Sequence, residues 1–172
     1  MHTAEYWIKK LNLQKHPEGG YFNEIYRSAE EIKREHLHSR YSGARNFSTS
    51  IYFLLTSDEF SAFHRIKSDE TWHFYSGKAV TLHMIDENGN YSSVRLGSNP
   101  ENGEGFQFTI PHGMWFAASV EEPDSYALVG CTVSPGFHFD DFELGKREEL
   151  LKLFPQHEKL INNFIAGYPR KE

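Results

Sequence analysis

Between residues 46 and 134 the chain alternates short runs of β-branched and aromatic residues with turn-forming residues. The clearest turn is Asn88-Gly89, because this pair readily takes the positive φ of a tight hairpin. Short strands with regular turns and no helical period between them predict a β-sandwich or a β-barrel. We expect strands over 46–56, 60–66, 71–75, 79–86, 91–96, 105–110, 114–119 and 126–134.

The N-terminal part of the chain changes pattern twice. Apolar residues at helical spacing behind Thr3, a suitable N-cap, predict a short amphipathic helix over 3–11. The segment 16–20 breaks this helix, and the charged segment 28–43 predicts a loop or an irregular helix. Between them a strand is expected over 21–27, with one face formed by Phe22, Glu24 and Tyr26.

The C-terminal part returns to a helical pattern after Pro135. Apolar spacing over 146–154 predicts one helix, and Pro155 suits the first turn of another. Its buried stripe is expected to consist of Leu160, Ile161, Phe164 and Ile165. With 172 residues and 38% hydrophobic side chains, the chain predicts one mainly β domain over 1–172, with terminal helices outside the strands.

Composition excludes several classes of function. The 18 basic and 24 acidic residues give a formal net charge of -6, and the basic residues do not cluster, so a nucleic-acid partner is not expected. No apolar run approaches the roughly 20 residues of a membrane-spanning helix. A single cysteine, Cys131, cannot form an intramolecular disulfide, and its apolar neighbours favour a buried, inert thiol. Without an export signal, we expect a cytoplasmic protein.

A concentrated group of ionisable and aromatic residues follows the strand expected over 60–66. The run from His64 to Gly77 contains two histidines, a glutamate and several aromatic side chains. It resembles the first sequence motif of the cupin family at His64, Glu70 and Gly77, and the second motif at Gly105, Pro111 and Gly113. This resemblance implies a double-stranded β-helix, the jelly-roll barrel, whose interior the motif residues face.

The same alignment bears on metal binding. Two of the four ligand positions of the cupin family are occupied here by Ile66 and Phe116, which are hydrocarbon. One imidazole and one carboxylate, His64 and Glu70, are too few for a tight zinc or iron site. Strand alternation directs His73 to the opposite face. We therefore expect neither a metal nor another cofactor.

Under the cupin resemblance, the implied barrel lining is an apolar cup that holds one base and one acid. Burial raises the pKa of a glutamate, and a neighbouring histidine opposes that shift, so the two could transfer protons near neutral pH. The structural alternative is that the acid and base merely satisfy each other's hydrogen bonds. The expected lining is His64, Ile66, Glu70, Trp72, Met114 and Phe116, with Glu24 and Thr49 as further polar contacts.

Two narrower resemblances extend this interpretation. Residues 19–24 are similar to an N-terminal pattern of the deoxysugar-nucleotide epimerases, with Gly19 in place of their arginine and Tyr126 as a candidate for their acid tyrosine. Nearly the whole chain resembles an uncharacterised, sugar-epimerase-like cupin branch. The matching runs are 16–22, 49–55, 63–65, 69–75 and 129–137. Such jelly-roll families imply a homodimer.

These observations predict a metal-independent epimerase or isomerase that binds a small carbohydrate-like or carbonyl-containing molecule. His64 would abstract a proton and Glu70 would orient or recharge it. Two alternatives remain open from the sequence: a binding or sensing protein that uses the same cup without turnover, and a metal-dependent cupin oxygenase, which Ile66 and Phe116 disfavour.

Overall fold

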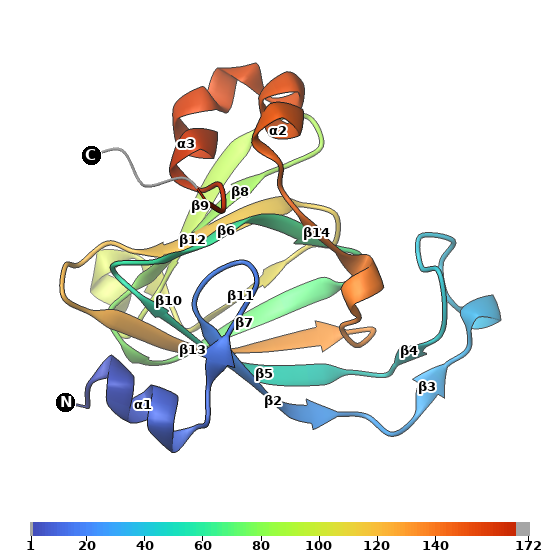
Figure 1. Ribbon diagram of the computed structural model, residues 1–172, viewed down its shortest axis with the longest axis horizontal. Coiled ribbons are helices and arrows are strands. Elements are labelled where there is room, and N and C mark those ends of the chain that lie inside the picture. The colour runs from blue at the N-terminus through green and yellow to red at the C-terminus, as the bar shows by residue number, and fades with distance from the viewer. Residues whose placement is uncertain (1, 168–172) are drawn as a thin grey trace.

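Two six-stranded β-sheets face each other in the computed structural model, which describes residues 2–167 (Figure 1). Residues 1 and 168–172 of the expected domain lie outside the described residues. The first sheet has the order β1 (Gln14–Lys15), β2 (Tyr21–Arg27), β5 (Thr49–Thr56), β13 (Tyr126–Ser134), β7 (Asp69–Gly77) and β11 (Gln107–Ile110). The second has the order β10 (Glu104–Gly105), β9 (Tyr91–Leu96), β8 (Val80–Ile85), β12 (Trp115–Val120), β6 (Phe60–Ile66) and β14 (Phe142–Leu144).

This arrangement confirms the predicted jelly roll. Every pair of neighbouring strands is antiparallel except β9 and β10, which are parallel. The sheets enclose a core built from the alternate, inward-facing residues of their strands. Its fully buried members include Leu55, Trp72, Leu82 and Phe116.

The terminal helices cover the outer faces of the sheets (Figure 1). Helix α1 (Ala4–Lys10) begins behind Thr3, whose hydroxyl caps Tyr6 N, and packs on the first sheet. Helices α2 (Arg147–Leu153) and α3 (Glu158–Asn163) pack on the second sheet through Leu150 and Ile161. The predicted positions of the helices are therefore confirmed. No helix within residues 2–167 is long and apolar enough to cross a membrane.

The segments expected to be irregular contain short elements. These are β3 (Glu31–Ile32), β4 (Arg45–Asn46) and the 3-10 turns η1 (Arg34–His36), η2 (Pro100–Asn102), η3 (Phe139–Asp141) and η4 (Pro155–His157). The strand expected over 105–110 is divided, because β10 pairs in the second sheet and β11 in the first. Strand β14 was not predicted, since its three residues have too few neighbours for an alternating pattern.

A β-bulge corrects the predicted face of β2. The register pairs Glu24 with Ile51 but Tyr26 with Ser50, so one extra residue, Ile25, interrupts the alternation. Tyr26 therefore leaves the face of Phe22 and Glu24, and Arg27 takes its place on the cavity side. Tyr26 is exposed on the outer face of the sheet. The homodimer expected from the resemblance stays a prediction.

A buried ion pair fixes the segment that precedes β14. The Arg45 guanidinium donates to both carboxylate oxygens of Asp141, with Nη2 at 2.6 Å from Oδ1, and both side chains are buried. Tyr41 lies under the guanidinium and bonds Ser68. Asp141 ends η3 and directly precedes β14, which pairs with β6 at the edge of the second sheet. The ion pair therefore anchors η3 and the start of β14.

Replacing Asp141 with alanine is expected to lower the free energy of unfolding by about 3–5 kcal/mol, because the Arg45 guanidinium would stay buried without its partner. Denaturant unfolding measures the loss. Glu149→Ala is the control: it breaks the exposed Lys146–Glu149 pair and should leave stability nearly unchanged. Equal losses in the two variants would contradict a special contribution from the buried pair.

Candidate functional site

A cavity of about 260 Å³ lies between the two sheets at one end of the barrel. The apolar core fills the other end, so the barrel is neither empty nor completely filled. The cavity wall is mostly aromatic and aliphatic but contains three glutamates and three histidines. Its lining consists of His16, Glu18, Phe22, Glu24, Arg27, Thr49, Ile51, Phe53, His64, Ile66, Glu70, Trp72, Cys131, Val133, Phe137, His138, Phe139 and Phe142.

His64 lies on β6 with both ring nitrogens engaged. Nδ1 is 2.7 Å from the carbonyl oxygen of Ala62, which can only accept, so Nδ1 carries a proton. In the neutral ring, Nε2 then holds the lone pair, and it lies 3.1 Å from Glu18 Oε2. The ring packs on Phe116 at a centroid distance of 4.0 Å. These contacts fix both the tautomer and the direction of the basic nitrogen.

Glu18 reaches His64 because its loop crosses from the first sheet to the second. Ala62 N on β6 donates to the Glu18 carbonyl at 2.8 Å, and Ser61 Oγ donates to Glu18 Oε1 at 2.8 Å. Gly19 makes this approach possible: its φ is 109°, and a Cβ there would lie 2.1 Å from Phe60 O. A tight turn next to a glycine therefore places a buried carboxyl opposite the imidazole.

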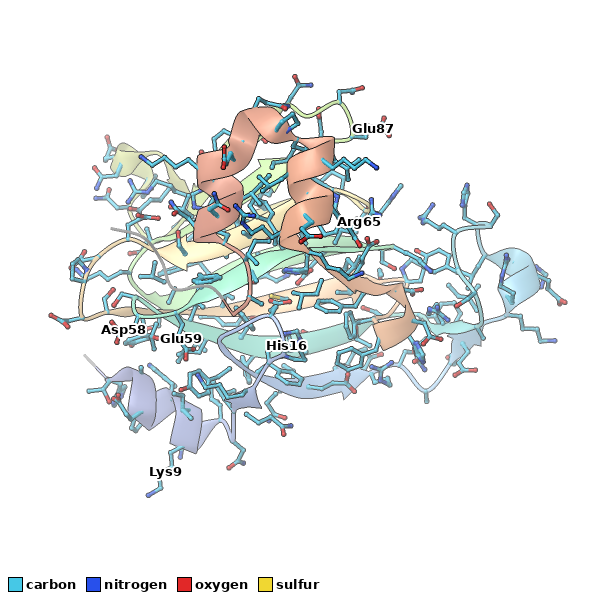
Figure 2. The ribbon with its side chains drawn as sticks, turned by 45° about the horizontal axis from the view of Figure 1, so that its top comes forward. Lys9, His16, Asp58, Glu59, Arg65 and Glu87 are labelled. Carbon is cyan, nitrogen blue, oxygen red and sulfur yellow. The ribbon has the colours of Figure 1, made fainter. Side chains whose placement is uncertain are left out.

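His16 belongs to the same cluster and is labelled in Figure 2 on the loop that leads into β2. Its Nδ1 accepts from Glu18 N at 3.3 Å and lies 3.4 Å from Glu18 Oε2. Phe22, Phe53 and Phe142 surround the ring edge to face. His16, Glu18 and His64 thus form a contiguous polar group inside an aromatic wall.

Burial determines the charge of this group. Desolvation raises the pKa of Glu18 well above its ordinary value, and the nearby Glu70 adds to the rise. Desolvation lowers the pKa of His64 to about 3 and that of His16 to about 4. Each shift favours the neutral form, so Glu18 and His64 share one proton between Oε2 and Nε2.

Glu70 and Trp72 occupy another part of the wall, on β7. Glu70 is 8% exposed, and burial raises its pKa to about 7, although the adjacent Cys131 and Trp72 side chains act in the opposite direction. The sequence predicts Glu70 as the partner of His64. Within residues 2–167, however, the carboxylate that lies within ion-pair distance of His64 is Glu18.

The other predicted binding residues divide into two groups. Glu24 and Thr49 line the cavity, where Arg27 holds Glu24 in a bidentate pair and Thr49 Oγ1 accepts from Phe137 N at 2.9 Å. Three others are not among the described residues that line it. Met114 and Phe116 pack in the core, and Tyr126 accepts from Trp7 Nε1 beside α1.

The donors present do not fit a metal of the kind that the cupin resemblance implies. Ile66 lines the cavity and Phe116 packs on His64, so neither ligand position has a donor atom. Within the described part of the chain, no three His, Cys, Asp or Glu side chains converge as a metal site requires. His64 Nδ1 is also occupied by Ala62 O.

Sequence reasoning missed His16, Glu18 and Arg27. The sequence analysis predicts only the end of a helix at residues 16–20. The two glycines next to Glu18 are the signal that could have indicated a tight turn, which carries the acid to another part of the fold. Arg27 reaches the cavity only because of the bulge in β2. Neither a strand pairing nor a bulge can be deduced from one short segment.

Comparison with known proteins gives consistent matches. The sequence profile described as "Cupin superfamily (DUF985)" matches residues 5–145. The uncharacterised protein YML079W of Saccharomyces cerevisiae is 34% identical over 161 residues, which cover 88% of this chain and 80% of the yeast protein.

Solved structures agree with this match. Protein SO0799 of Shewanella oneidensis is 38% identical with a TM-score of 0.87, covering 96% of this chain and 99% of that one. A hypothetical protein of Leishmania major is 39% identical with a TM-score of 0.87, covering 95% and 99%. Oxalate decarboxylase of Bacillus subtilis, at 16% identity and a TM-score of 0.53 over 90% of this chain and 37% of its own, shares the fold alone.

The raised pKa of Glu70 predicts a pH-dependent stability. Its carboxyl is protonated in the folded protein up to about pH 7 and in an unfolded chain only up to about 4.5, so the stabilisation is complete below pH 4.5 and is lost as the pH rises through 7. Glu70→Gln should therefore gain about 3 kcal/mol relative to the unmodified protein between pH 4.5 and pH 8.

Denaturant unfolding at several pH values measures this difference. Glu35→Gln, on exposed η1, controls for the loss of one acidic group. Parallel pH profiles for Glu70→Gln and the unmodified protein would show that Glu70 is not held in its neutral form.

Proposed function

The chain belongs to the cupin superfamily, and on this premise we propose that it is a metal-independent proton-transfer enzyme, an epimerase or isomerase of a small carbohydrate-like or carbonyl-containing molecule. The resemblance of residues 19–24 to the deoxysugar-nucleotide epimerases supports this reaction class. The cavity of about 260 Å³ suits one small molecule of sugar-ring size held between the sheets.

The His64–Glu18 pair is the observation that carries this assignment. A ring nitrogen and a carboxyl oxygen lie 3.1 Å apart at the wall of a cavity, with one proton between them. Removal of a proton from a carbon next to a carbonyl requires a base that is fixed in direction and shielded from water. His64 Nε2 meets both conditions, because Ala62 O fixes the tautomer and aromatic side chains surround the ring.

In this mechanism the neutral Glu18 carboxyl turns its proton away from His64 Nε2, which then takes the proton from the substrate carbon. Glu18 Oε2 accepts the hydrogen bond of the imidazolium that forms and so keeps the ring oriented. The sequence predicts that Glu70 orients His64, whereas we assign this role to Glu18, because Glu18 lies within ion-pair distance of the ring. Ser61 and the Ala62 backbone hold Glu18 in turn, so the base has a rigid support. Glu24 and Thr49 would supply further polar contacts from the cavity wall.

Deuterium uptake tests this function. A panel of small ketoses, aldoses and ketones is incubated with the protein in D₂O, and NMR follows the hydrogen next to the carbonyl. We expect protein-dependent exchange with at least one compound, reduced by about 100-fold or more in His64→Gln and in Glu18→Gln. His73→Gln is the matched control, since His73 bonds Thr132 rather than lining the cavity, and it should exchange normally.

Two outcomes would contradict the proposal. Exchange at an unchanged rate in both His64→Gln and Glu18→Gln would remove the pair from the reaction. A compound that binds and raises Tm without any deuterium uptake would favour the alternative function, a binding or sensing protein that uses the same cavity.

A further inference from the structure

The indole N–H of Trp72 is a buried donor without an acceptor. Trp72 is 1% exposed, lines the cavity, and its Nε1 has no hydrogen-bond partner within residues 2–167. Buried donors in folded proteins are nearly always paired, so one that lines a cavity indicates a missing acceptor. The other two tryptophans differ in position: Trp7 Nε1 donates to Tyr126, and Trp115 packs under α2 and α3.

Glu70 lies beside this unpaired donor. The two residues are separated by one position on β7 and both line the cavity. The indole N–H is directed toward the Glu70 carboxyl closely enough to lower its pKa against the effect of burial, but within residues 2–167 it makes no hydrogen bond of normal length and angle. The groups that shift this pKa include no cationic side chain. The Trp72 N–H and the Glu70 carboxyl therefore lie on the β7 side of the cavity, in the first sheet. His64 lies on β6, in the second sheet.

We propose that Trp72 Nε1 and the Glu70 carboxyl, which both line the cavity from β7, form an oxygen-binding subsite for the carbonyl group of an uncharged substrate. Both groups donate, and an sp² oxygen has two lone pairs to accept them. The subsite rests on the proposed function, because it places the carbonyl oxygen of that substrate and leaves the adjacent carbon to the His64–Glu18 pair.

The electrostatics of the cavity favour an uncharged substrate. Glu70 and Glu18 both lie on its wall, and their burial favours the neutral acids. A substrate carboxylate or phosphate at this depth would face acidic groups and no buried cation. The guanidinium of Arg27, the cation among the lining residues, is held by Glu24, Asn46 and the carbonyl of Phe137.

The subsite also completes the proton balance of the proposed reaction. As the C–H bond next to the carbonyl breaks, its proton goes to His64 Nε2 and its electron pair forms the C=C bond. The carbonyl π electrons move to oxygen, which takes the proton of Glu70, and Trp72 N–H stabilises the developing charge. The product is an enol with Glu70 as carboxylate and His64 as imidazolium. When the substrate is an α-hydroxy carbonyl compound, this product is an enediol: Glu70 then takes the proton of the second hydroxyl while His64 gives its proton to the former carbonyl carbon, which completes an isomerisation.

Binding of a matched pair of probes tests the subsite without turnover. Cyclohexanone carries the carbonyl oxygen, whereas methylenecyclohexane has the same shape with a CH₂ group in its place. With indole-¹⁵N-labelled protein, we expect cyclohexanone to move the Trp72 N–H signal downfield and methylenecyclohexane to leave it upfield. Trp7→Phe and Trp115→Phe assign the signal by elimination, so the readout does not depend on a Trp72 variant that fails to fold.

Affinity gives a second readout. Cyclohexanone should bind at least about tenfold more tightly than methylenecyclohexane, and Trp72→Phe should reduce this preference about fivefold, as expected for loss of one hydrogen bond. Equal affinities for the two probes, or equal movement of the Trp72 signal, would overturn the subsite.

The pH dependence isolates Glu70. Only the protonated carboxyl donates, so cyclohexanone affinity should fall by about tenfold or more between pH 6 and pH 8.5 while methylenecyclohexane affinity stays constant. Above pH 6, His64 and His16 are already neutral. Burial also raises the pKa of Glu18, so Glu18→Gln is the control for the second buried carboxyl and should keep the pH dependence. Glu70→Gln keeps a donor and should remove the pH dependence, whereas His138→Gln, at the mouth, should not.

The two proposals fail separately. If deuterium exchange depends on His64 but the probes bind equally, the subsite is overturned and the proton-transfer function stands. If the carbonyl preference depends on Trp72 but no compound exchanges deuterium, the subsite stands and the function becomes that of a binder of neutral carbonyl compounds.

Discussion

The burial of polar groups inside an apolar barrel is the constraint on which this site depends. A carboxyl and an imidazole that lose their water must find partners in the protein or change their charge. Glu18 and His64 do both: they face each other at 3.1 Å, and desolvation moves their pKa values in opposite directions toward the neutral forms. The loop at residues 16–20 is held on β6 by the hydrogen bond from Ala62 N, and this contact places Glu18 opposite His64.

The same constraint separates the cavity into two chemically different walls. On one wall the Glu18 carboxyl, both ring nitrogens of His64 and Nδ1 of His16 have neighbours that can satisfy them. On the other, Trp72 Nε1 has no acceptor, and no cationic side chain shifts the pKa of Glu70, among the residues that the structure describes. A satisfied wall can support a fixed base, whereas an unsatisfied wall is complementary to something that enters the cavity. This asymmetry is the basis for the proposal that the cavity holds and orients a small molecule.

The absence of donor atoms at Ile66 and Phe116 is compatible with a proton-transfer reaction that needs no metal. With Ile66 and Phe116 at two ligand positions, the interior cannot gather donors around one ion, but the same substitutions make the surroundings of His64 more apolar. Apolar surroundings favour shared protons over separated charges. These surroundings are therefore consistent with the proton transfer proposed for this site.

The sequence by itself determined the jelly roll and the terminal helices, because strand periodicity, helix capping and motif spacing are local properties. It also predicted five residues that line the cavity: His64, Glu70, Trp72, Glu24 and Thr49. Only the tertiary structure decided that Glu18 is the partner of His64 and that Arg27, not Tyr26, faces the cavity. It also placed Met114, Phe116 and Tyr126 outside the cavity lining. The physical reason is that a glycine turn crossing between sheets and a one-residue bulge change which side chains meet, while they leave the local pattern of the sequence almost unaltered.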